Sequence, residues 1–201
     1  ARKSLCTIGD SCWHCHAGVG SYPLQVARQY KLPLLVWGES TAEFGSKSTY
    51  ADPMDFDETY YLKVSMKVDS SEMVDEESGL TQRDLYPFRL PLHEELAEQG
   101  IQGIHLGDYI FWDGERQGDF VKKEYGWRED KVEGTYKGYK SVECRMAGVH
   151  DYSKWVKRGF GRATDHVSID VRNGIMSREE GFALAKKIDA ERPGELDYYL
   201  E

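Results

Sequence analysis

The pattern of hydrophobic and polar positions is clear up to Gly38 and weakens after it. The apolar positions of the segment 23–30 recur at helical spacing, and Pro23 suits a first helical turn, so the pattern predicts a helix there. The apolar run LPLLVWG follows and ends at Gly38, which is typical of a strand buried on both faces. A helix, a short connection and a buried strand make half of a β–α–β unit, so the pattern indicates an α/β layer architecture.

The middle of the chain is less regular up to about Thr81. The segment 58–77 is expected to form a mostly exposed helix with loops. The sequence PLHEELAEQG predicts a short helix that Gly100 stops. A second strand is predicted from Ile104 to about Phe111, followed by a helix through DFVKKEYGW.

The last third of the chain has a helical pattern. The segment GVHDYSKWVKRGFG ends at glycines, and TDHVSIDVRNG stops at Gly174. The segment SREEGFALAKKID opens with Ser177 and Glu180 in the register of a capping box. The tail ERPGELDYYLE is expected to pack loosely or to contact a neighbour.

Composition narrows the possible classes of protein. A length of 201 residues with 40% hydrophobic residues suits one domain, or one domain with an appendage. No apolar run approaches the ~18 residues of a membrane span, and mean hydropathy is −0.64, so we expect a soluble protein. A net charge of −9 argues against general affinity for nucleic acid. Four cysteines and no apolar leader at the start favour a reducing cytoplasm over secretion.

The string CWHCH at 12–16 is open to several chemistries. Cys12 and Cys15 form a C-x-x-C pair that can place two sulfur ligands on one metal, and Cys144 or a neighbouring histidine can complete such a site. Three cysteines and one histidine suit zinc, whereas three cysteines with an open position suit an iron–sulfur cluster. The same string also fits covalent haem attachment, but a cytoplasmic location disfavours that interpretation. A thioredoxin-like redox pair is disfavoured because the segment before Cys12 is polar and does not resemble a strand. Buried free thiols are the plain alternative.

The order of four sequence blocks resembles that of a known family. The blocks GDSCWHCHAGVGSYPLQVARQYKLPLLVWGES, LTQRDLYPFRLPLHEEL, GIQGIHLGDYIFWD and VHDYSKWVKRGFGRATDHVSIDVRNGIMSREEGFAL are similar to successive parts of the N-acetyl sugar amidotransferases. These are bacterial enzymes of surface-polysaccharide synthesis in the PP-loop ATP pyrophosphatase superfamily. The resemblance extends from about Gly9 to Lys187.

The resemblance implies a fold and a reaction. The fold is a partial Rossmann-like α/β sheet of the PP-loop type that lacks its N-terminal half, over residues 1–135, with a helical C-terminal extension over 136–201. The reaction is ATP-dependent amidotransfer, in which adenylation of a sugar acetamido oxygen lets ammonia displace AMP and leave an acetamidino group. ATP with magnesium, an N-acetylated nucleotide sugar and a glutaminase subunit that supplies ammonia are the implied substrates and partner.

One departure from the family concerns the nucleotide loop. The SGG-x-DS type of sequence is absent from the 201 residues, and a glycine-rich loop of this kind cradles pyrophosphate through backbone N–H groups. We therefore expect these residues to be the later part of a longer polypeptide, inactive without the upstream loop.

The resemblance also assigns candidate site residues. The strand and turn with Trp37, Gly38 and Glu39 correspond to the part that faces the nucleotide. In related sulfur-inserting enzymes a C-x-x-C joins a later cysteine to hold a cluster, which corresponds here to a metal site of Cys12, Cys15 and Cys144.

A second group of polar residues lies in GVHDY and ATDH. His150, Asp151 and Thr164 are candidate sugar-binding residues, and His166 with Asp165 is the candidate catalytic pair, since a histidine pKa lies near the working range. The alternative is that Thr164 or Asp165 caps a helix.

Weaker candidates surround this group. Trp112 and Asp113 are weaker candidates for the same roles in sugar binding or proton transfer. Four basic residues are candidates for binding a nucleotide-sugar diphosphate, namely Arg145, Lys154, Lys157 and Arg158. The rival functions are a cluster-dependent PP-loop sulfurtransferase and a non-catalytic interaction module held together by a metal.

Overall fold

The computed structural model describes residues 1–38, 58–111 and 113–201, which form two compact units. The first unit comprises Ala1–Ile8 and Cys12–Asp113, and the second comprises Gly9–Ser11 and Gly114–Glu201. Glu39 and Trp112, both singled out from the sequence, lie outside the described residues.

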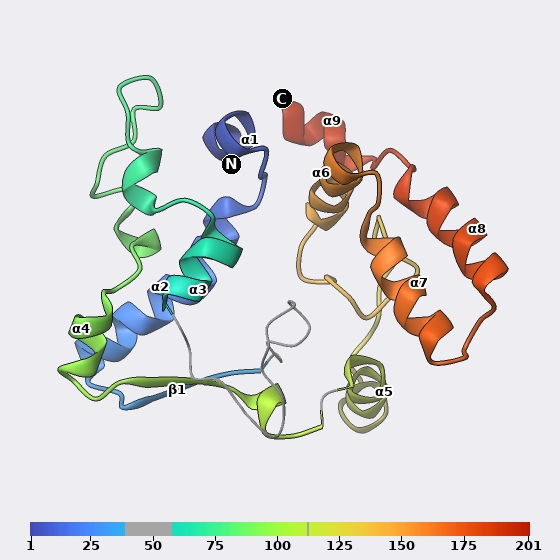
Figure 1. Cartoon of the computed structure of the whole chain (residues 1–201), viewed down its shortest axis with the longest axis horizontal. Coiled ribbons are helices and arrows are strands. Elements are labelled where there is room, and N and C mark those ends of the chain that lie inside the picture. Colours follow the sequence, from blue (N-terminus) through green and yellow to red (C-terminus); the bar gives the residue numbers. More distant parts are fainter. Residues whose placement is uncertain (39–57, 112) are drawn as a thin grey trace. The chain divides into compact units, whose positions relative to one another are not determined.

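The first unit contains one long helix, several short ones and a two-stranded parallel sheet (Figure 1). Its α-helices are α1 (Arg2–Ile8), α2 (Trp13–Tyr30), α3 (Glu58–Tyr61) and α4 (His93–Ala97). Its strands are β1 (Leu34–Trp37) and β2 (Gln102–His105), and its other helical turns are the π-helix η2 (Leu62–Met66) and the 3-10 turns η3 (Ser70–Met73), η4 (Tyr86–Phe88) and η5 (Leu106–Asp108).

Helix α2 begins ten residues before the predicted start and runs through Pro23. The prediction that Pro23 opens the helix is therefore wrong. Trp13, Ala17 and Leu24 recur on one face and are almost fully buried. Burial of this face offsets the cost of an interior proline, about 3 kcal/mol, because it places the whole helix against the core of the unit.

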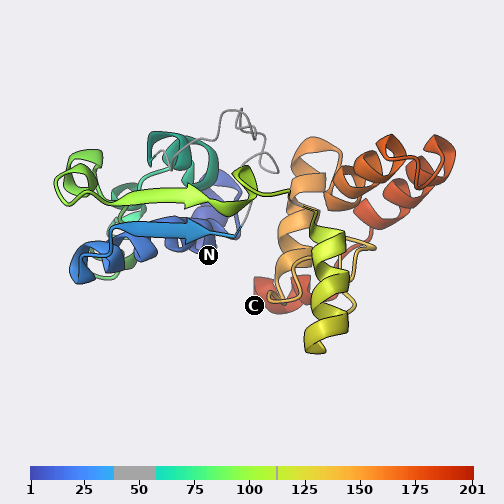
Figure 2. The ribbon, with the colours of Figure 1, turned by 90° about the horizontal axis from the view of Figure 1, so that it is seen from below.

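Strands β1 and β2 lie side by side and run in the same direction, with Leu34 paired to Gln102 and Trp37 to His105 (Figure 2). The expectation that the first strand is buried on both faces is wrong for the described residues, because Leu34 and Val36 are about half exposed. Leu35 and Trp37, on the other face, pack against the core of the unit. The second strand begins and ends earlier than predicted and passes into η5.

The segment after residue 58 also differs from its prediction. We expected a mostly exposed helix, but the structure has short α, π and 3-10 pieces, and the side chain of Met66 is fully buried. Met66 and Met73 join Trp13 and Leu24 in the core.

The second unit is helical and contains α5 (Gly114–Tyr125), α6 (Ala147–Arg158), α7 (Arg162–Arg172), α8 (Arg178–Asp189) and α9 (Glu195–Leu200). Helices α7 and α8 form a close antiparallel pair. Their contact depends on Gly181, since a Cβ atom there would lie 2.6 Å from Cγ1 of Val167. The predicted ends are confirmed at two places: Gly159 ends α6 in the left-handed region, and the capping box of Ser177 with Glu180 opens α8. The tail forms α9.

The residues that the structure describes are thus mostly helical, with one parallel pair of strands among them. The Rossmann-like PP-loop assignment remains a prediction, as does the domain boundary at 135/136. The two compact units divide at 113/114. None of the described helices has both the length and the apolar character needed to cross a membrane.

Candidate functional site

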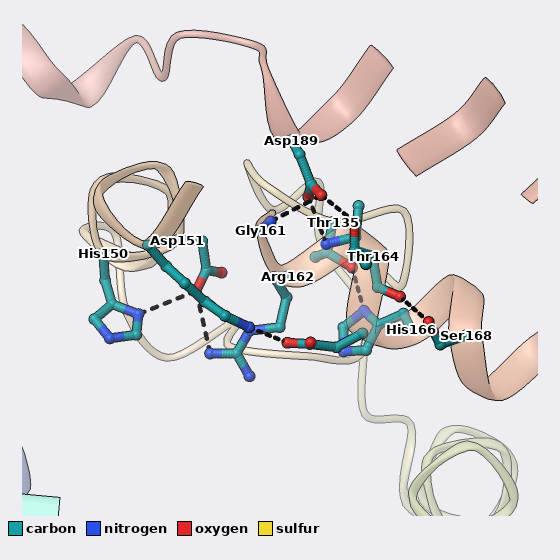
Figure 3. Close-up of polar contacts among 12 residues, drawn as sticks. Thr135, His150, Asp151, Gly161, Arg162, Thr164, His166, Ser168 and Asp189 are labelled. Carbon is teal, nitrogen blue, oxygen red and sulfur yellow. Dashed lines mark hydrogen bonds and ion pairs between the residues drawn. The ribbon is translucent and has the colours of Figure 1, made fainter. Parts of the chain in front are cut away.

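Asp151 lies at the centre of a charged group on α6. Its side chain is 4% exposed, and Oδ1 accepts hydrogen bonds from Nδ1 of His150 at 3.0 Å and from Nε and Nη2 of Arg162 at 3.2 Å (Figure 3). Arg162 is the first residue of α7, so the carboxylate links α6 to α7. Because Nδ1 of His150 donates to Asp151, the imidazole is held in one orientation with Nε2 as its other polar atom.

The charge state of Asp151 follows from its partners. Burial by itself raises the pKa of the Asp151 carboxyl, but the hydrogen bond from His150 and the positive charge of Arg162 more than offset it. The pKa is therefore lower than the usual value, and Asp151 is ionised at neutral pH. A buried carboxylate paired with a partly exposed histidine is an arrangement that suits proton transfer.

His166 lies on the next helix and is buried. Its Nδ1 is 2.7 Å from the hydroxyl oxygen of Thr135 (Figure 3). Burial, followed by the nearby charges of Arg162 and Lys140, lowers the pKa of His166 to about 4. The expected pKa near the working range is therefore wrong for this residue, and His166 is neutral at pH 7. Its neutral ring holds Thr135 in place.

Asp165, the other candidate catalytic residue, forms an ion pair with Lys154 on α6. The ammonium of Lys154 also lies 4.8 Å from the ring centroid of Phe160. Asp165 and His166 are adjacent in sequence, but they have different partners. The structure thus separates the predicted catalytic pair into an ion pair and a buried, hydrogen-bonded imidazole.

Thr164 has a structural partner that the sequence did not indicate. Its hydroxyl donates to Oδ2 of Asp189, the last residue of α8. The same carboxylate accepts the backbone N–H of Gly161 at 2.8 Å and that of Ala163 at 2.9 Å (Figure 3). Asp189 therefore caps the N-terminus of α7 from 25 to 28 residues away in the sequence, and neither Thr164 nor Asp165 acts as the cap.

Three consecutive residues, Gly134 to Tyr136, each lie against one buried polar side chain of α6 or α7, and Thr135 and Tyr136 form hydrogen bonds with theirs. Gly134 lies against Asp151, where an added Cβ would be 3.1 Å from the Asp151 Cβ. Thr135 contacts His166, and the hydroxyl of Tyr136 donates to Asp170 at 2.6 Å. These contacts fix the backbone of a segment that has no regular secondary structure.

Asp170 carries a second contact of the same kind. Its Oδ2 lies 2.9 Å from the ammonium of Lys137, which also contacts Glu115 at 2.9 Å. Burial raises the pKa of Asp170, but the hydrogen bonds from Tyr136 and Lys137 outweigh it, so the pKa lies below its usual value. Burial and the bond to Asp170 raise the pKa of Tyr136, which stays protonated.

Residues 134–136 line a cleft of about 770 Å³ within the second unit. Residues of the connection between α8 and α9, and Gly148 at the start of α6, line it as well. Charged residues of both signs line the cleft: Asp130, Lys131, Glu133, Glu143, Arg145, Glu191, Arg192 and Glu195. Its volume is in the range of small-molecule sites.

Two contacts join residues that line the cleft. Oε1 of Glu133 accepts the backbone N–H of Gly194 at 2.8 Å, and Nε of Arg145 lies 2.7 Å from Oε2 of Glu195. Gly148 allows the close approach of Glu133, since a Cβ there would lie 2.5 Å from the Glu133 Cβ. These contacts tie Glu133 and Arg145 to the start of α9.

Of the four basic residues proposed for a diphosphate, Arg145 lines the cleft. Lys154 pairs with Asp165, and Nζ of Lys157 donates to the carbonyl oxygen of Gly9 at 2.6 Å. Arg158 is an exposed residue at the end of α6.

The cysteine pair is at the start of α2. Cys12 precedes the first turn, and its carbonyl oxygen accepts the backbone N–H groups of Cys15 and His16. Cys15 is exposed, and Cys144 belongs to the second unit, where it lines the cleft. Among the described residues, no three histidine, cysteine, aspartate or glutamate side chains are arranged to hold a metal ion. The site of Cys12, Cys15 and Cys144 remains a prediction.

The candidate nucleotide-facing residues lie at the end of β1. The ring of Trp37 stacks on His105 of β2, with centroids 5.6 Å apart, and Gly38 is exposed directly after the strand. The strands are parallel, so these residues lie at their carboxyl ends, which is the edge where α/β sheets bind ligands.

Comparison with known proteins bears on the second unit. Residues 133–201 match the family model of the LPS biosynthesis protein WbpG-like, C-terminal domain. The WbpG-like region begins at Glu133, and it contains α6 to α9 and the polar residues of Figure 3. This match supports the expected relation to the C-terminal portion of a lipopolysaccharide-biosynthesis protein. No curated protein matches the chain.

The sequence did not single out several residues that the structure brings into the site. Thr135, Arg162 and Asp189 contact predicted residues, Asp170 accepts from Tyr136, and Glu133 accepts from Gly194 in the cleft lining. One signal was available: Asp170 lies four residues after His166, so both are on one helix face. A polar pair on the buried face of an amphipathic helix needs partners, and this indicates a polar network.

Proposed function

We propose that the protein takes part in ATP-dependent amidotransfer onto an N-acetylated nucleotide sugar in lipopolysaccharide synthesis. The observation that carries the proposal is the match of residues 133–201 to the WbpG-like C-terminal domain. The order of sequence blocks over a longer part of the chain adds the specific reaction. Ammonia would come from a glutaminase partner.

The chemistry requires activation of a poor leaving group. The acetamido oxygen attacks the α-phosphorus of ATP, pyrophosphate leaves, and an O-adenylated imidate forms. Ammonia then adds to the imidate carbon and loses a proton, and AMP departs with the former amide oxygen. An acetamidino group remains on the sugar. The protein must hold the reactants in line and accept the proton of ammonia.

His150 is the better-placed proton acceptor of the two histidines in the second unit. Its Nδ1 donates to the ionised carboxylate of Asp151, so Nε2 is the basic atom, and its side chain is 26% exposed. His166 is buried and its pKa is lowered to about 4, which makes it a weak base. In this proposal Asp151 is the positioning residue and His166 supports Thr135.

The remaining predicted residues take supporting roles in the proposal. Trp37 and Gly38, at the carboxyl ends of the parallel strands, would face the nucleotide, and Glu39, outside the described residues, would contact its ribose or its metal. Thr164 and Asp165 would stabilise α7 by their contacts with Asp189 and Lys154. A zinc ion or iron–sulfur cluster on Cys12, Cys15 and Cys144 would be structural, since no step of amidotransfer requires sulfur.

An isotope experiment tests the reaction. The product of the complete reading frame is incubated with ATP, magnesium, ammonium chloride and a nucleotide N-acetyl sugar whose amide carries oxygen-18. We expect AMP that contains the heavy oxygen and a sugar that has gained nitrogen. Release of AMP without label, or retention of label in the sugar, would contradict the proposal.

A further inference from the structure

The turn that opens helix α2 brings Cys12 and Cys15 together. Cys12 is the N-cap of the helix, and its carbonyl oxygen accepts the backbone N–H of Cys15 at 2.9 Å and that of His16 at 3.0 Å. A carbonyl bonded to the N–H three residues later keeps the two Cα atoms within about 7 Å of each other. Disulfides span Cα separations of about 4.4–6.8 Å, so the turn has the size that a disulfide needs.

The helical positions of the two cysteines place their side chains on the same side of the turn. The N-cap and N3 residues of a helix are the ones whose side chains meet in a capping box, and Cys12 and Cys15 occupy these two positions. Cys6 belongs to α1 and Cys144 to the second unit, so neither shares this turn. The local geometry therefore favours a bond between the sulfur atoms of Cys12 and Cys15.

Trp13 fixes the backbone of the same turn. Its side chain is 3% exposed, its indole N–H donates to the carbonyl oxygen of Val68 at 3.1 Å, and its ring centroid lies 5.7 Å from that of Phe88. The residue between the two cysteines is thus anchored in the core of the first unit. A pre-organised pair of sulfur atoms can join without the entropy cost of closing a flexible loop.

The two sulfur atoms differ in their access to solvent. Cys15 is exposed, whereas Cys12 is half-buried. A disulfide in solution can reach an exposed sulfur, and a second sulfur on the same turn can then displace the adduct. This division into an attacking and a resolving cysteine needs only the helical turn, so it does not depend on the preceding strand of thioredoxin-like proteins.

From these features we infer that Cys12 and Cys15 are a reversible oxidation site that exchanges with small-molecule disulfides such as glutathione disulfide. The Cys15 sulfur attacks one sulfur of glutathione disulfide, whose S–S bond breaks, and one glutathione leaves as a thiol with the proton of Cys15. The Cys12 sulfur then attacks Cys15, and the second glutathione leaves as a thiol with the proton of Cys12. Two protein thiols are oxidised to one disulfide, and glutathione disulfide is reduced to two glutathione molecules.

The role of such a pair follows from its position at the surface of one turn. A disulfide that closes a loop of four residues constrains the unfolded chain far less than one that closes a long loop. In a reducing compartment, disulfides that form and break in this way serve as redox sensors. The site would therefore report the redox state and contribute little to the stability of the fold.

A redox titration of the whole chain tests the inference. The protein is equilibrated without oxygen in mixtures of glutathione and glutathione disulfide, quenched with acid and alkylated with N-ethylmaleimide, and its intact mass then counts the thiols. We expect two of the four thiols to be lost together, without bound glutathione, and to return in excess reduced glutathione. Circular dichroism should give the same helix content for both forms, because the turn already has the required geometry.

Four serine variants locate the pair. Cys6→Ser and Cys144→Ser should each retain the paired loss of two thiols. Cys12→Ser should stop at the mixed disulfide of Cys15 with glutathione, and Cys15→Ser should react roughly tenfold more slowly, because Cys12 is less exposed. In these last two variants the yield of protein disulfide should fall roughly 100-fold or more, since the intramolecular displacement is lost.

Three results would overturn the inference: no loss of thiols in a large excess of glutathione disulfide, a protein disulfide that persists in Cys12→Ser or Cys15→Ser, or a tightly held zinc ion or cluster that keeps both thiols reduced in the same buffer. The third result would favour the predicted metal site. The readout is the state of the thiols and requires no amidotransfer, so the proposed reaction stands or falls separately in the isotope experiment.

Discussion

The hydroxyl oxygen of Thr135 lies 2.7 Å from Nδ1 of His166, and this contact joins the wall of the cleft to helix α7. The predicted catalytic residue therefore acts on the cleft through another side chain. A neutral imidazole can accept or donate at Nδ1, whereas a protonated one can only donate. The state of the cleft wall is thus coupled to a buried titration.

We predict that stability falls in acid because of His166. Its pKa is about 4 in the folded protein, against an ordinary histidine value of 6.5, so the unfolded chain binds more protons between these limits. The contribution is fully present above pH 6.5 and decreases as pH falls towards 4, by about 3 kcal/mol in total. Urea unfolding of the whole chain, followed by circular dichroism between pH 4 and 7.5, measures it.

The matched variant for this experiment is His166→Gln, which cannot take up a proton in this range. It should flatten the pH dependence between 6.5 and 4. The low pKa values of Asp151 and Asp170 affect stability at lower pH, since stability is lost only as their carboxyls are protonated. A variant with the same slope as the wild type would show that another group titrates.

The cap that Asp189 provides on α7 predicts that two cap substitutions lower the free energy of unfolding by unequal amounts. Asp189→Ala leaves the N–H groups of Gly161 and Ala163 without their acceptor in a buried place, so we expect a loss of about 2–4 kcal/mol. Ser177→Ala removes a cap of α8 that is open to water and should cost about 1 kcal/mol. Denaturant unfolding measures both, and equal losses would contradict the tertiary cap.

Two helical glycines should respond oppositely to alanine. Gly181→Ala places a Cβ 2.6 Å from Val167 and 2.8 Å from Val171, so α7 and α8 must separate, at a cost of about 1–3 kcal/mol. Gly118→Ala, within α5, meets Tyr139 at an ordinary 3.5 Å and should stabilise by about 0.5–1 kcal/mol. Thermal unfolding gives the two signs. A stabilising change at Gly181 would show that the helices pack less closely.

The proposed proton-transfer role of His150 predicts that its substitution lowers kcat but changes the stability of the fold little. His150→Gln should lower kcat for amidotransfer by roughly 10²–10⁴-fold, because the proton of ammonia loses its acceptor. The unfolding free energy should change by less than about 1 kcal/mol, since the side chain is partly exposed. His166→Gln is the comparison. A larger loss of kcat in the second variant would reverse the roles of the two histidines.

Sequence reasoning was most successful where the signal is local. The capping box of Ser177 with Glu180 depends on four residues, and the structure has it. Pro23 was misread because its local preference for a first turn competes with the burial of α2, which depends on distant residues such as Met66. Asp189 could not be found, because its carboxylate acts on backbone groups 26 and 28 residues earlier.

In the candidate site, too, local patterns were predictable and contacts between distant residues were not. Periodicity marked His150, Asp151 and His166 as polar residues in core-forming helices, and all three lie in the polar network. Their roles were not evident, because orientation and pKa depend on the fold. Thr135 is in an irregular segment with no periodicity, so nothing in the sequence linked it to His166.

The carboxylate of Asp189, at the end of α8, also sets the order in which α7 and α8 can fold during translation. Helix α7 is translated first, and its uncapped N–H groups must wait until Asp189 has left the ribosome. During that interval a nascent chain lacks the anchor for the start of α7. The hairpin of α7 and α8 should consequently become protease-resistant in a single late step, after the polypeptide has extended past residue 189.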